Sequence, residues 1–155
     1  MTARGSNLLL RSATTHDHNE IAEIWFSSAS LPGVGPPVMP TEDDLRDRVA
    51  HEIGAGWRVT VAEQNNELVG FAAIKPKRSI LDQLFVRPDQ IGTGLGYALL
   101  IECQILMPGG FTLHTATSND QARRFYERAG LKILRQGLHP RTGHPVTYYG
   151  WNGHS

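Results

Sequence analysis

Short apolar runs bounded by turn residues alternate along this chain with stretches in which apolar side chains recur every three or four positions. The first pattern is typical of β-strands and the second of helices that bury one face. The alternation predicts an α/β protein of the α+β type. Strands are expected at residues 8–11, 57–63, 68–74, 80–86, 111–115, 132–138 and 146–151. Helices are expected at residues 18–28, 41–53 and 95–107, and from Asn119 to Gly130.

Prolines, glycines and capping residues mark the ends of these elements. Residues 31–40 hold four prolines and two glycines, which excludes regular structure there. Thr41, followed by three acidic residues, is typical of a helix N-terminus. Gly54 and Gly56 are expected to end that helix. The polar residues 64–67 predict a hairpin turn.

Residues 84–96 give the strongest indication of a binding site. An apolar strand is stopped by Pro88, and glycines stand at positions 92, 94 and 96, where a helix begins. Glycine lets backbone N–H groups turn outward and lets a ligand approach the main chain closely. Because a helix N-terminus also favours an anion, this turn is expected to hold a phosphate or pyrophosphate.

Three kinds of nucleotide site compete for this turn. A Walker loop needs Lys and then Ser or Thr after its last glycine, but Tyr97 follows Gly96. A dinucleotide site needs the spacing Gly-x-Gly-x-x-Gly in the first strand–turn–helix, whereas this chain has Gly-x-Gly-x-Gly past its middle. The third interpretation is a pyrophosphate loop for an acyl-coenzyme A. A glycine-rich turn without a ligand is the alternative.

A second segment, residues 119–131, narrows the choice. Ser118 or Asn119 can cap a helix there, Ala122 and Phe125 lie near one face, and Gly130 ends it. Together the two segments resemble the GNAT superfamily of N-acetyltransferases. Val86-Arg87-Pro88 and residues 91–96 resemble its pyrophosphate motif, and Asn119, Ala122, Phe125-Tyr126-Glu127 and Gly130-Leu131 resemble its second motif. The resemblance extends more loosely from Leu10 to Trp151.

The resemblance implies one GNAT acetyltransferase domain over residues 1–155. Its fold would be a central, mixed but mostly antiparallel twisted sheet of about six to seven strands, flanked by about four helices. It implies that acetyl-CoA is the co-substrate and that its phosphates bind the glycine turn. Its pantetheine arm would bind main-chain groups of Phe85 and Val86 and the side chain of Asn119. The residues expected to contact it are Leu84, Phe85, Val86, Ile91, Gly92, Thr93, Gly94, Leu95, Gly96, Asn119 and Tyr126.

One position departs from the family pattern. Ile91 stands where the family usually has Gln or Arg, with Gln90 just before it. The backbone donors of residues 93–96 do not depend on that side chain. The departure therefore predicts a weakened or altered contact with the co-substrate, and not the loss of the site.

Acetyl transfer to an amine needs an acceptor for the amine proton and a proton donor for the departing thiolate. The resemblance assigns the donor to Tyr126; packing beside Phe125 is the alternative. Asp82 is one candidate base, with Gln83 expected on the opposite face of its strand, and a solvated pair with Lys77 or Arg78 is its alternative role. His114 is another, since its ordinary pKa near 6.5 suits a base, although it can be structural. An ordered water is the third.

The acceptor is expected to enter opposite the glycine turn. In the resembling family the first two helices and their connection wall the acceptor site, so Trp25, Phe26 and Pro36 are expected to line it. Core packing is the alternative for Trp25. The strand 84–86 is expected to offer a backbone N–H to the oxyanion.

Composition limits the remaining functions. Lys plus Arg equals Asp plus Glu at 15 each, and no basic cluster is interleaved with aromatic residues, which argues against a nucleic-acid partner. No apolar stretch approaches a membrane span, one cysteine excludes an internal disulfide, and a cytoplasmic location is expected.

His139 and His144 lack a carboxylate or cysteine at ligand spacing, so no metal is expected. Cys103 is expected in the core beside Leu99 and Leu106.

The sequence thus predicts an N-acetyltransferase that transfers acetyl from acetyl-CoA to a primary amine by direct attack in a ternary complex. The acceptor is a small molecule or an exposed protein amine, and the neutral net charge favours a small amine. A non-catalytic acyl-CoA-binding or sensing module with the same fold is the alternative. The oligomeric state, a homodimer included, is left open.

Overall fold

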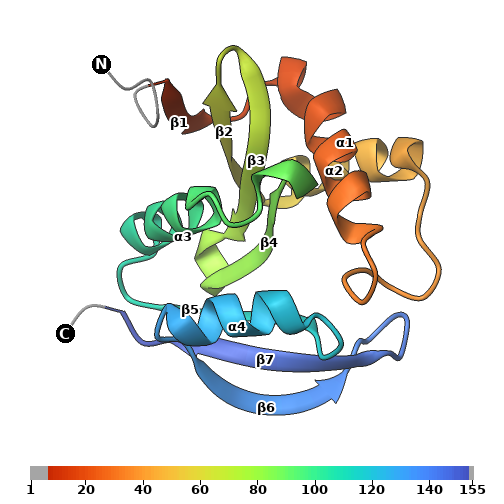
Figure 1. Cartoon of the computed structure of the whole chain (residues 1–155), viewed down its shortest axis with the longest axis vertical. Helices are drawn as coiled ribbons and strands as arrows, with labels where there is room; N and C mark the ends of the chain where they lie inside the picture. The colour runs from red at the N-terminus through yellow and green to blue at the C-terminus, as the bar shows by residue number, and fades with distance from the viewer. Residues whose placement is uncertain (1–6, 154–155) are drawn as a thin grey trace.

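A single twisted sheet forms the centre of the structure, a computed structural model that describes residues 7–153 (Figure 1). The strand order is β1-β2-β3-β4-β5-β7-β6. Neighbouring strands are antiparallel except β4 and β5, which are parallel. Among the described residues, the seven strands are β1 (Leu8–Ser12), β2 (Arg58–Gln64), β3 (Glu67–Lys75), β4 (Ile80–Val86), β5 (Phe111–Ala116), β6 (Lys132–Leu138) and β7 (Pro145–Trp151). The sheet is mixed and mostly antiparallel, as expected.

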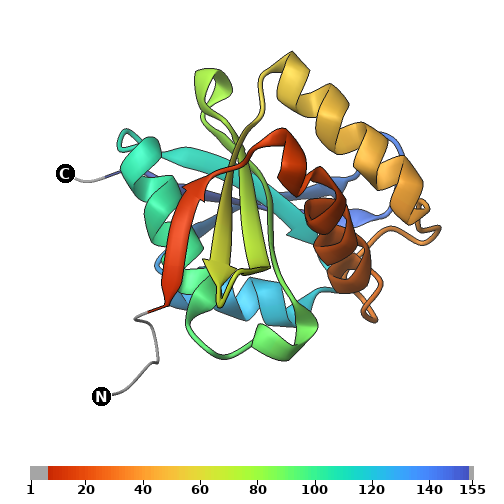
Figure 2. The same ribbon diagram turned by 90° about the horizontal axis from the view of Figure 1, so that it is seen from above.

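Within residues 7–153, four α-helices cover the two faces of this sheet (Figure 2). α1 (His18–Ala29) and α2 (Glu42–Ala55) pack on one face through a core that contains Trp25, Val49 and Phe71. α3 (Leu95–Leu106) and α4 (Asp120–Arg128) pack on the other through Leu99 and Tyr126. The two faces therefore have separate apolar cores, which hold the sheet between them.

Local sequence explains where the helices begin and end. The Thr41 hydroxyl accepts a hydrogen bond from Asp44 N–H at 3.1 Å, and the Asp44 carboxylate accepts one from Thr41 N–H, which is a capping box. Asn119 Oδ1 accepts from Ala122 N–H at 3.1 Å and caps α4. Gly56, with φ of 127°, ends α2. The expectation that Gly54 helps to end this helix is wrong, since it lies within α2 in open space.

The sheet opens between β4 and β5. Their pairing holds at Ile80 and Thr112, where Thr112 N–H also donates to Ser79 C=O at 2.9 Å. Past this point the two parallel strands diverge, so the second half of β4 faces β5 without a continuous ladder. Backbone groups along that edge of β4 are left for other partners. This opening positions the candidate site.

Candidate active site

The glycine turn between β4 and α3 has the geometry of an anion site. Gly92 and Gly94 have φ of 84° and 90°, and no atom lies within 4 Å of where a Cβ would stand on either. Gly94 is the N-cap of α3, so the first N–H groups of that helix have no intrahelical acceptor. Thr93 N–H, in contrast, already donates to Gln90 C=O at 3.3 Å. The donors available to a phosphate are therefore Gly92 N–H and those from Gly94 onward.

A cavity of about 550 Å³ runs from this turn toward the sheet opening. Gly92, Gly94 and Gly96 line one end of it, and Ile91, 38% exposed, also lines it. Gly96 lies close to α4, because a Cβ there would stand 3.6 Å from the Phe125 ring. We call this space the cofactor groove. Its size and its glycine end fit a long ligand with phosphates at one end.

The hydrogen-bond phase of β4 decides which of its peptide groups face the groove. Arg87 N–H donates to Val69 C=O at 2.8 Å, so alternate residues of β4, Phe85 among them, pair with β3. The expectation that the main chain of Phe85 binds pantetheine is therefore wrong; the residue still borders the groove, with its ring packed near Phe71 at 6.1 Å. Main-chain groups of Leu84 and Val86 point toward the opening. The Val86 oxygen accepts a hydrogen bond from Ser28 Oγ at 2.7 Å, which leaves the N–H of Val86 and both groups of Leu84.

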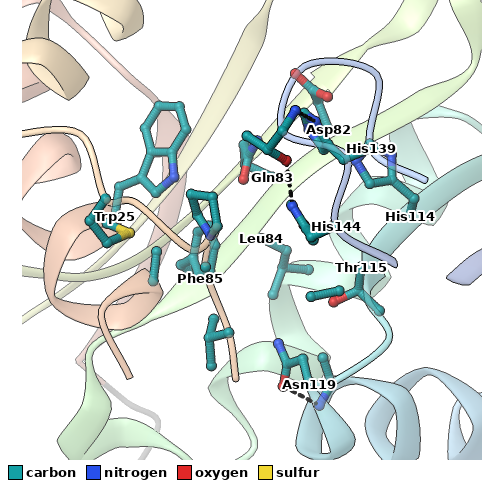
Figure 3. A pocket seen from close by; sticks show the side chains of 18 of the residues that line it. Trp25, Asp82, Gln83, Leu84, Phe85, His114, Thr115, Asn119, His139 and His144 are labelled. Atoms are coloured by element: carbon teal, nitrogen blue, oxygen red, sulfur yellow. Dashed lines mark hydrogen bonds between the residues drawn. The ribbon is translucent and has the colours of Figure 1, made fainter. Parts of the chain in front are cut away.

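A second cavity, of about 310 Å³, lies on the α1–α2 face (Figure 3). Figure 3 shows Asp82, His114, His139 and His144 gathered toward one end of it and Asn119 at the other. We call this space the acceptor cavity. It shares a wall with the cofactor groove, made of Val34, Leu84, Phe85, Asn119, Ala122 and Tyr126. The two cavities thus meet where β4 and β5 part.

Tyr126 stands in this shared wall. It is 7% exposed, and its ring packs edge-on against Phe125 at 5.2 Å and near Tyr149 at 5.9 Å. Among the described residues its hydroxyl has no hydrogen-bond partner. Burial raises the pKa of this phenol well above its ordinary value. The group therefore stays protonated at neutral pH and is free to donate.

Asp82 occupies a β-bulge. Ala73 pairs with Gln83 and Ile74 with Leu81, so Asp82 is the extra residue on β4. Its Oδ2 accepts from Trp57 Nε1 at 2.8 Å and lies 3.7 Å from Lys75 Nζ. The bulge breaks the side-chain alternation: Leu81 and Leu84 both pack in the α3–α4 core, so Asp82 and Gln83 between them both face the acceptor cavity. The expectation that these two side chains face opposite ways is wrong, and the cation beside Asp82 is Lys75, not Lys77 or Arg78.

Three histidines meet at the mouth of the acceptor cavity. The His114 ring lies 5.6 Å from the His139 ring, which stacks on His144 at 5.1 Å. Burial lowers the pKa of His114, a nearby His144 lowers it further, and the Asp82 charge acts in the opposite direction. Burial also lowers the pKa of His139. Both rings are therefore neutral near pH 7.

The expected acceptor wall is present in part. Trp25 and Pro36 line the acceptor cavity, and Trp25 also belongs to the core at 5% exposure. Phe26 lines neither cavity and instead packs against the core under α1, so its assignment to the wall is wrong. The loop that carries Pro36 is anchored to the turn before α4, because Ser118 Oγ donates to Gly33 C=O at 2.8 Å.

Arg48 and Arg141 were missed by the sequence reasoning. Both line the acceptor cavity, and the Arg48 guanidinium lies 4.9 Å from the centre of the Trp25 ring. A signal for Arg48 existed, since it stands on α2 between the core residues Leu45 and Val49. Arg141 lies in the β6–β7 turn, where no local pattern indicates a distant cavity.

Cys103 lies outside both cavities. Burial raises the pKa of the Cys103 thiol to about 12, which agrees with a core residue. Across residues 7–153 no group of His, Cys, Asp or Glu side chains has an arrangement that could hold a metal ion. No helix in the same range is long and apolar enough to cross a membrane.

Comparison with known families agrees with this architecture. Residues 16–131 match the model of the acetyltransferase (GNAT) family, and the chain belongs to that family. It is therefore an acyltransferase that uses acetyl-CoA, as the resemblance of the two motifs implied.

Relatives of known activity share the chemistry of this family. The 5-NmdU N-acetyltransferase of Pseudomonas phage PaMx11 is 26% identical over 136 residues, covering 84% of this chain and 91% of that protein. The peptidyl-lysine N-acetyltransferase YjaB of Salmonella typhimurium is 35% identical over 75 residues, covering 48% of this chain and 49% of that protein.

Solved structures share the fold. An acetyltransferase of the GNAT family from Desulfovibrio desulfuricans has a TM-score of 0.75 at 20% identity, covering 94% of this chain and 98% of that one. The yncA acetyltransferase of Salmonella typhimurium, solved with acetyl-CoA, has a TM-score of 0.70 at 18% identity, covering 96% of both chains.

Proposed function

We propose that residues 1–155 form one acetyltransferase domain that acetylates a primary amine of a small molecule by direct attack within a ternary complex. The observation that carries the proposal is the shared wall between the cofactor groove and the acceptor cavity. One cavity ends at the glycine turn and the other at the histidine cluster, and the two meet at this wall. Two different substrates can therefore be bound side by side. Relatives named as acetylating 5-NmdU and peptidyl-lysine support an amine acceptor.

The residues present fit acetyl-CoA. The N–H groups of Gly94, Leu95 and Gly96 would hold the phosphates, and the absence of any neighbour near Gly92 and Gly94 leaves room for them. The open edge of β4 at Leu84 and Val86 would pair with the pantetheine amides, as an added strand does. Acetyl-CoA supplies an activated acetyl thioester when bound there.

Tyr126 would supply the proton for the departing thiolate. Its place in the shared wall, its free hydroxyl and its raised pKa all support a neutral phenol that acts as a general acid. Asn119 supports this arrangement, because its amide caps α4 and so fixes the start of the helix that carries Tyr126.

The structure favours His114 over Asp82 as the group that takes the amine proton. His114 is neutral at the cavity mouth, which is the form that accepts a proton. Asp82 is held by both Trp57 and Lys75, and so has a structural role available. A water held near His114 could carry the proton between the amine and the imidazole.

A thiol-release assay tests the function. The full chain is incubated with acetyl-CoA and a broad panel of primary amines, and free coenzyme A is measured. Amine-dependent release with a mass increase of the amine by one acetyl group is expected. Binding of acetyl-CoA by calorimetry with no amine-dependent release would instead indicate the non-catalytic binding module.

A further inference from the structure

Positive charge collects in the acceptor cavity without a matching anion. The charged residues that line it are Arg48, Asp82 and Arg141. Asp82 already pairs with Lys75, which does not line the cavity. Neither the Arg48 nor the Arg141 guanidinium takes part in an ion pair or a hydrogen bond among the described residues. The chain as a whole has no net charge, so this excess is local.

The Arg48 guanidinium is the more costly of the two charges. It is half-buried and lies over the Trp25 ring. Burial lowers its pKa, the charge of Arg141 lowers it further, and Glu52 and Asp82 only partly oppose both effects. A desolvated cation that faces a second cation is unfavourable unless an anion lies between them.

The turn that carries Arg141 adds neutral hydrogen-bond donors. Backbone N–H groups of Arg141 and Thr142 donate to His139 Nδ1 at 3.1 and 3.3 Å. Because the neutral His139 ring accepts at Nδ1, its proton lies on Nε2, which is then a donor. Guanidinium and imidazole N–H groups at one cavity mouth are the donor set that binds carboxylate and phosphate oxygens.

We infer that the acceptor is an amine that also carries an anionic group, a carboxylate or a phosphate-type anion, which Arg48 and Arg141 bind. This inference rests on the proposed function, because it names the substrate class of the same site. Amines with a second positive charge are disfavoured in the same cavity by like-charge repulsion. The amine end of the acceptor would then lie at the shared wall near Tyr126.

Matched acceptors test the inference. A series of ω-amino acids of increasing length is compared with alkylamines of the same length, with ω-aminoalkylphosphonates, and with diamines. For at least one length, kcat/KM for an anionic acceptor is expected to exceed that of the alkylamine by about 10- to 100-fold, as a charge-assisted contact provides. The carboxylate and phosphonate arms distinguish the two kinds of anion. Equal values for neutral and anionic amines would overturn the inference.

Variants show whether the arginines carry the preference. Arg48→Gln and Arg141→Gln are expected to lower the anionic-to-neutral ratio toward one, with acetyl-CoA affinity unchanged. Arg46→Gln is the matched control, since Arg46 lies on the same helix and pairs with Asp43 at the surface. Arg48→Lys keeps the charge and should keep much of the preference. An unchanged ratio in both glutamine variants would contradict the inference, and Arg141, being exposed, keeps the test available if Arg48→Gln does not fold.

A binding measurement separates this inference from the proposed function. Inorganic phosphate and glutarate are titrated into the full chain by calorimetry. Saturable binding that Arg48→Gln or Arg141→Gln abolishes supports the anion site even if no amine in the panel is acetylated. Thiol release that shows no preference for anionic amines supports the function and overturns the inference. If the chain shows neither thiol release nor anion binding, both the proposed function and this inference are overturned.

Discussion

The indole N–H of Trp57, which does not line the acceptor cavity, donates at 2.8 Å to Oδ2 of Asp82, which does line it. Trp57 is 5% exposed, so its N–H depends on this carboxylate. The bulge in β4 turns Asp82 toward Trp57. Without the extra residue, the regular alternation of side chains along the strand would not bring Asp82 to this position. The contact therefore gives Asp82 a structural role independent of proton transfer.

Asp82→Asn is expected to change kcat by less than about threefold, since the amide oxygen still accepts from Trp57. Asp82→Ala leaves the indole N–H without a partner and is expected to lower the free energy of unfolding by about 1–3 kcal/mol. Steady-state kinetics and urea denaturation measure the two effects. A fall in kcat of about 100-fold in a stable Asp82→Asn variant would instead identify Asp82 as the base.

Gly94→Glu is expected to weaken acetyl-CoA binding at least about tenfold, because it brings an anion to the phosphate donors at the start of α3. A positive φ of 90° also strains any side chain there. Gly56→Glu is the matched control, since Gly56 has a positive φ in open space at the end of α2, away from the groove. Calorimetry with folded variants measures this; equal affinities for the two would show that the phosphates bind elsewhere.

Much of the fold follows from local sequence. The strand expected at residues 132–138 and the strand leading into the glycine turn have the bounds that the structure gives. Glycine and proline mark the nearby ends, since Gly130 precedes the first strand and Pro88 follows the second. The hairpin between β2 and β3 is similarly local, because Asn65 and Asn66 accept the positive φ values of 54° and 66° that its turn requires.

The acceptor cavity was harder to predict because its parts come from separate elements. The bulge at Asp82 depends on how β3 pairs with β4, which no single strand encodes. His139 and His144 join His114 only because β7 pairs with both β5 and β6. Arg48 comes from a helix on the same face. The glycine turn, in contrast, is contiguous and therefore visible in the sequence.

Tyr126→Phe is expected to lower kcat by about 100-fold with little change in acetyl-CoA affinity, because it deletes the proton donor and keeps the ring. Tyr149→Phe is the control: its hydroxyl donates to Glu127 at 2.6 Å, so its loss should reduce stability and leave kcat nearly unchanged. Single-turnover kinetics ensure that chemistry is measured. A kcat within about twofold for Tyr126→Phe would make Tyr126 structural.

The pH dependence of kcat/KM tests His114. Its pKa is lowered from 6.5, so the neutral base is present at pH 7 and the acid limb of the profile lies below pH 6.5. The unfolded chain binds this proton more tightly, so the stability contributed by neutral His114 is present above pH 6.5 and is lost as pH falls. His114→Asn should remove the acid limb, whereas the exposed His51→Asn should keep it. An unchanged acid limb in His114→Asn would indicate that an ordered water, and not His114, takes the amine proton.

Replacing Pro36 and Pro37 with glycine is expected to raise the acceptor KM several-fold and to leave acetyl-CoA affinity nearly unchanged. Pro36 lines the acceptor cavity and does not line the cofactor groove. Each Pro→Gly change increases the conformational entropy of the open or unfolded loop, which favours that state by about 0.4–1 kcal/mol. The wall of the acceptor cavity is then ordered for a smaller fraction of the time. The anchor from Ser118 to Gly33 stays in place, which limits the effect to the middle of the loop.

The exposed Pro108→Gly is the matched control, because Pro108 lies in the turn before β5 and lines neither cavity. Initial rates with varied acceptor give KM, and calorimetry gives the affinity for acetyl-CoA. If the acceptor lies against this loop, only the Pro36–Pro37 variant shifts KM. Loss of acetyl-CoA affinity with an unaltered acceptor KM would show that the two substrates are assigned to the wrong cavities, because the loop would then border the pantetheine arm.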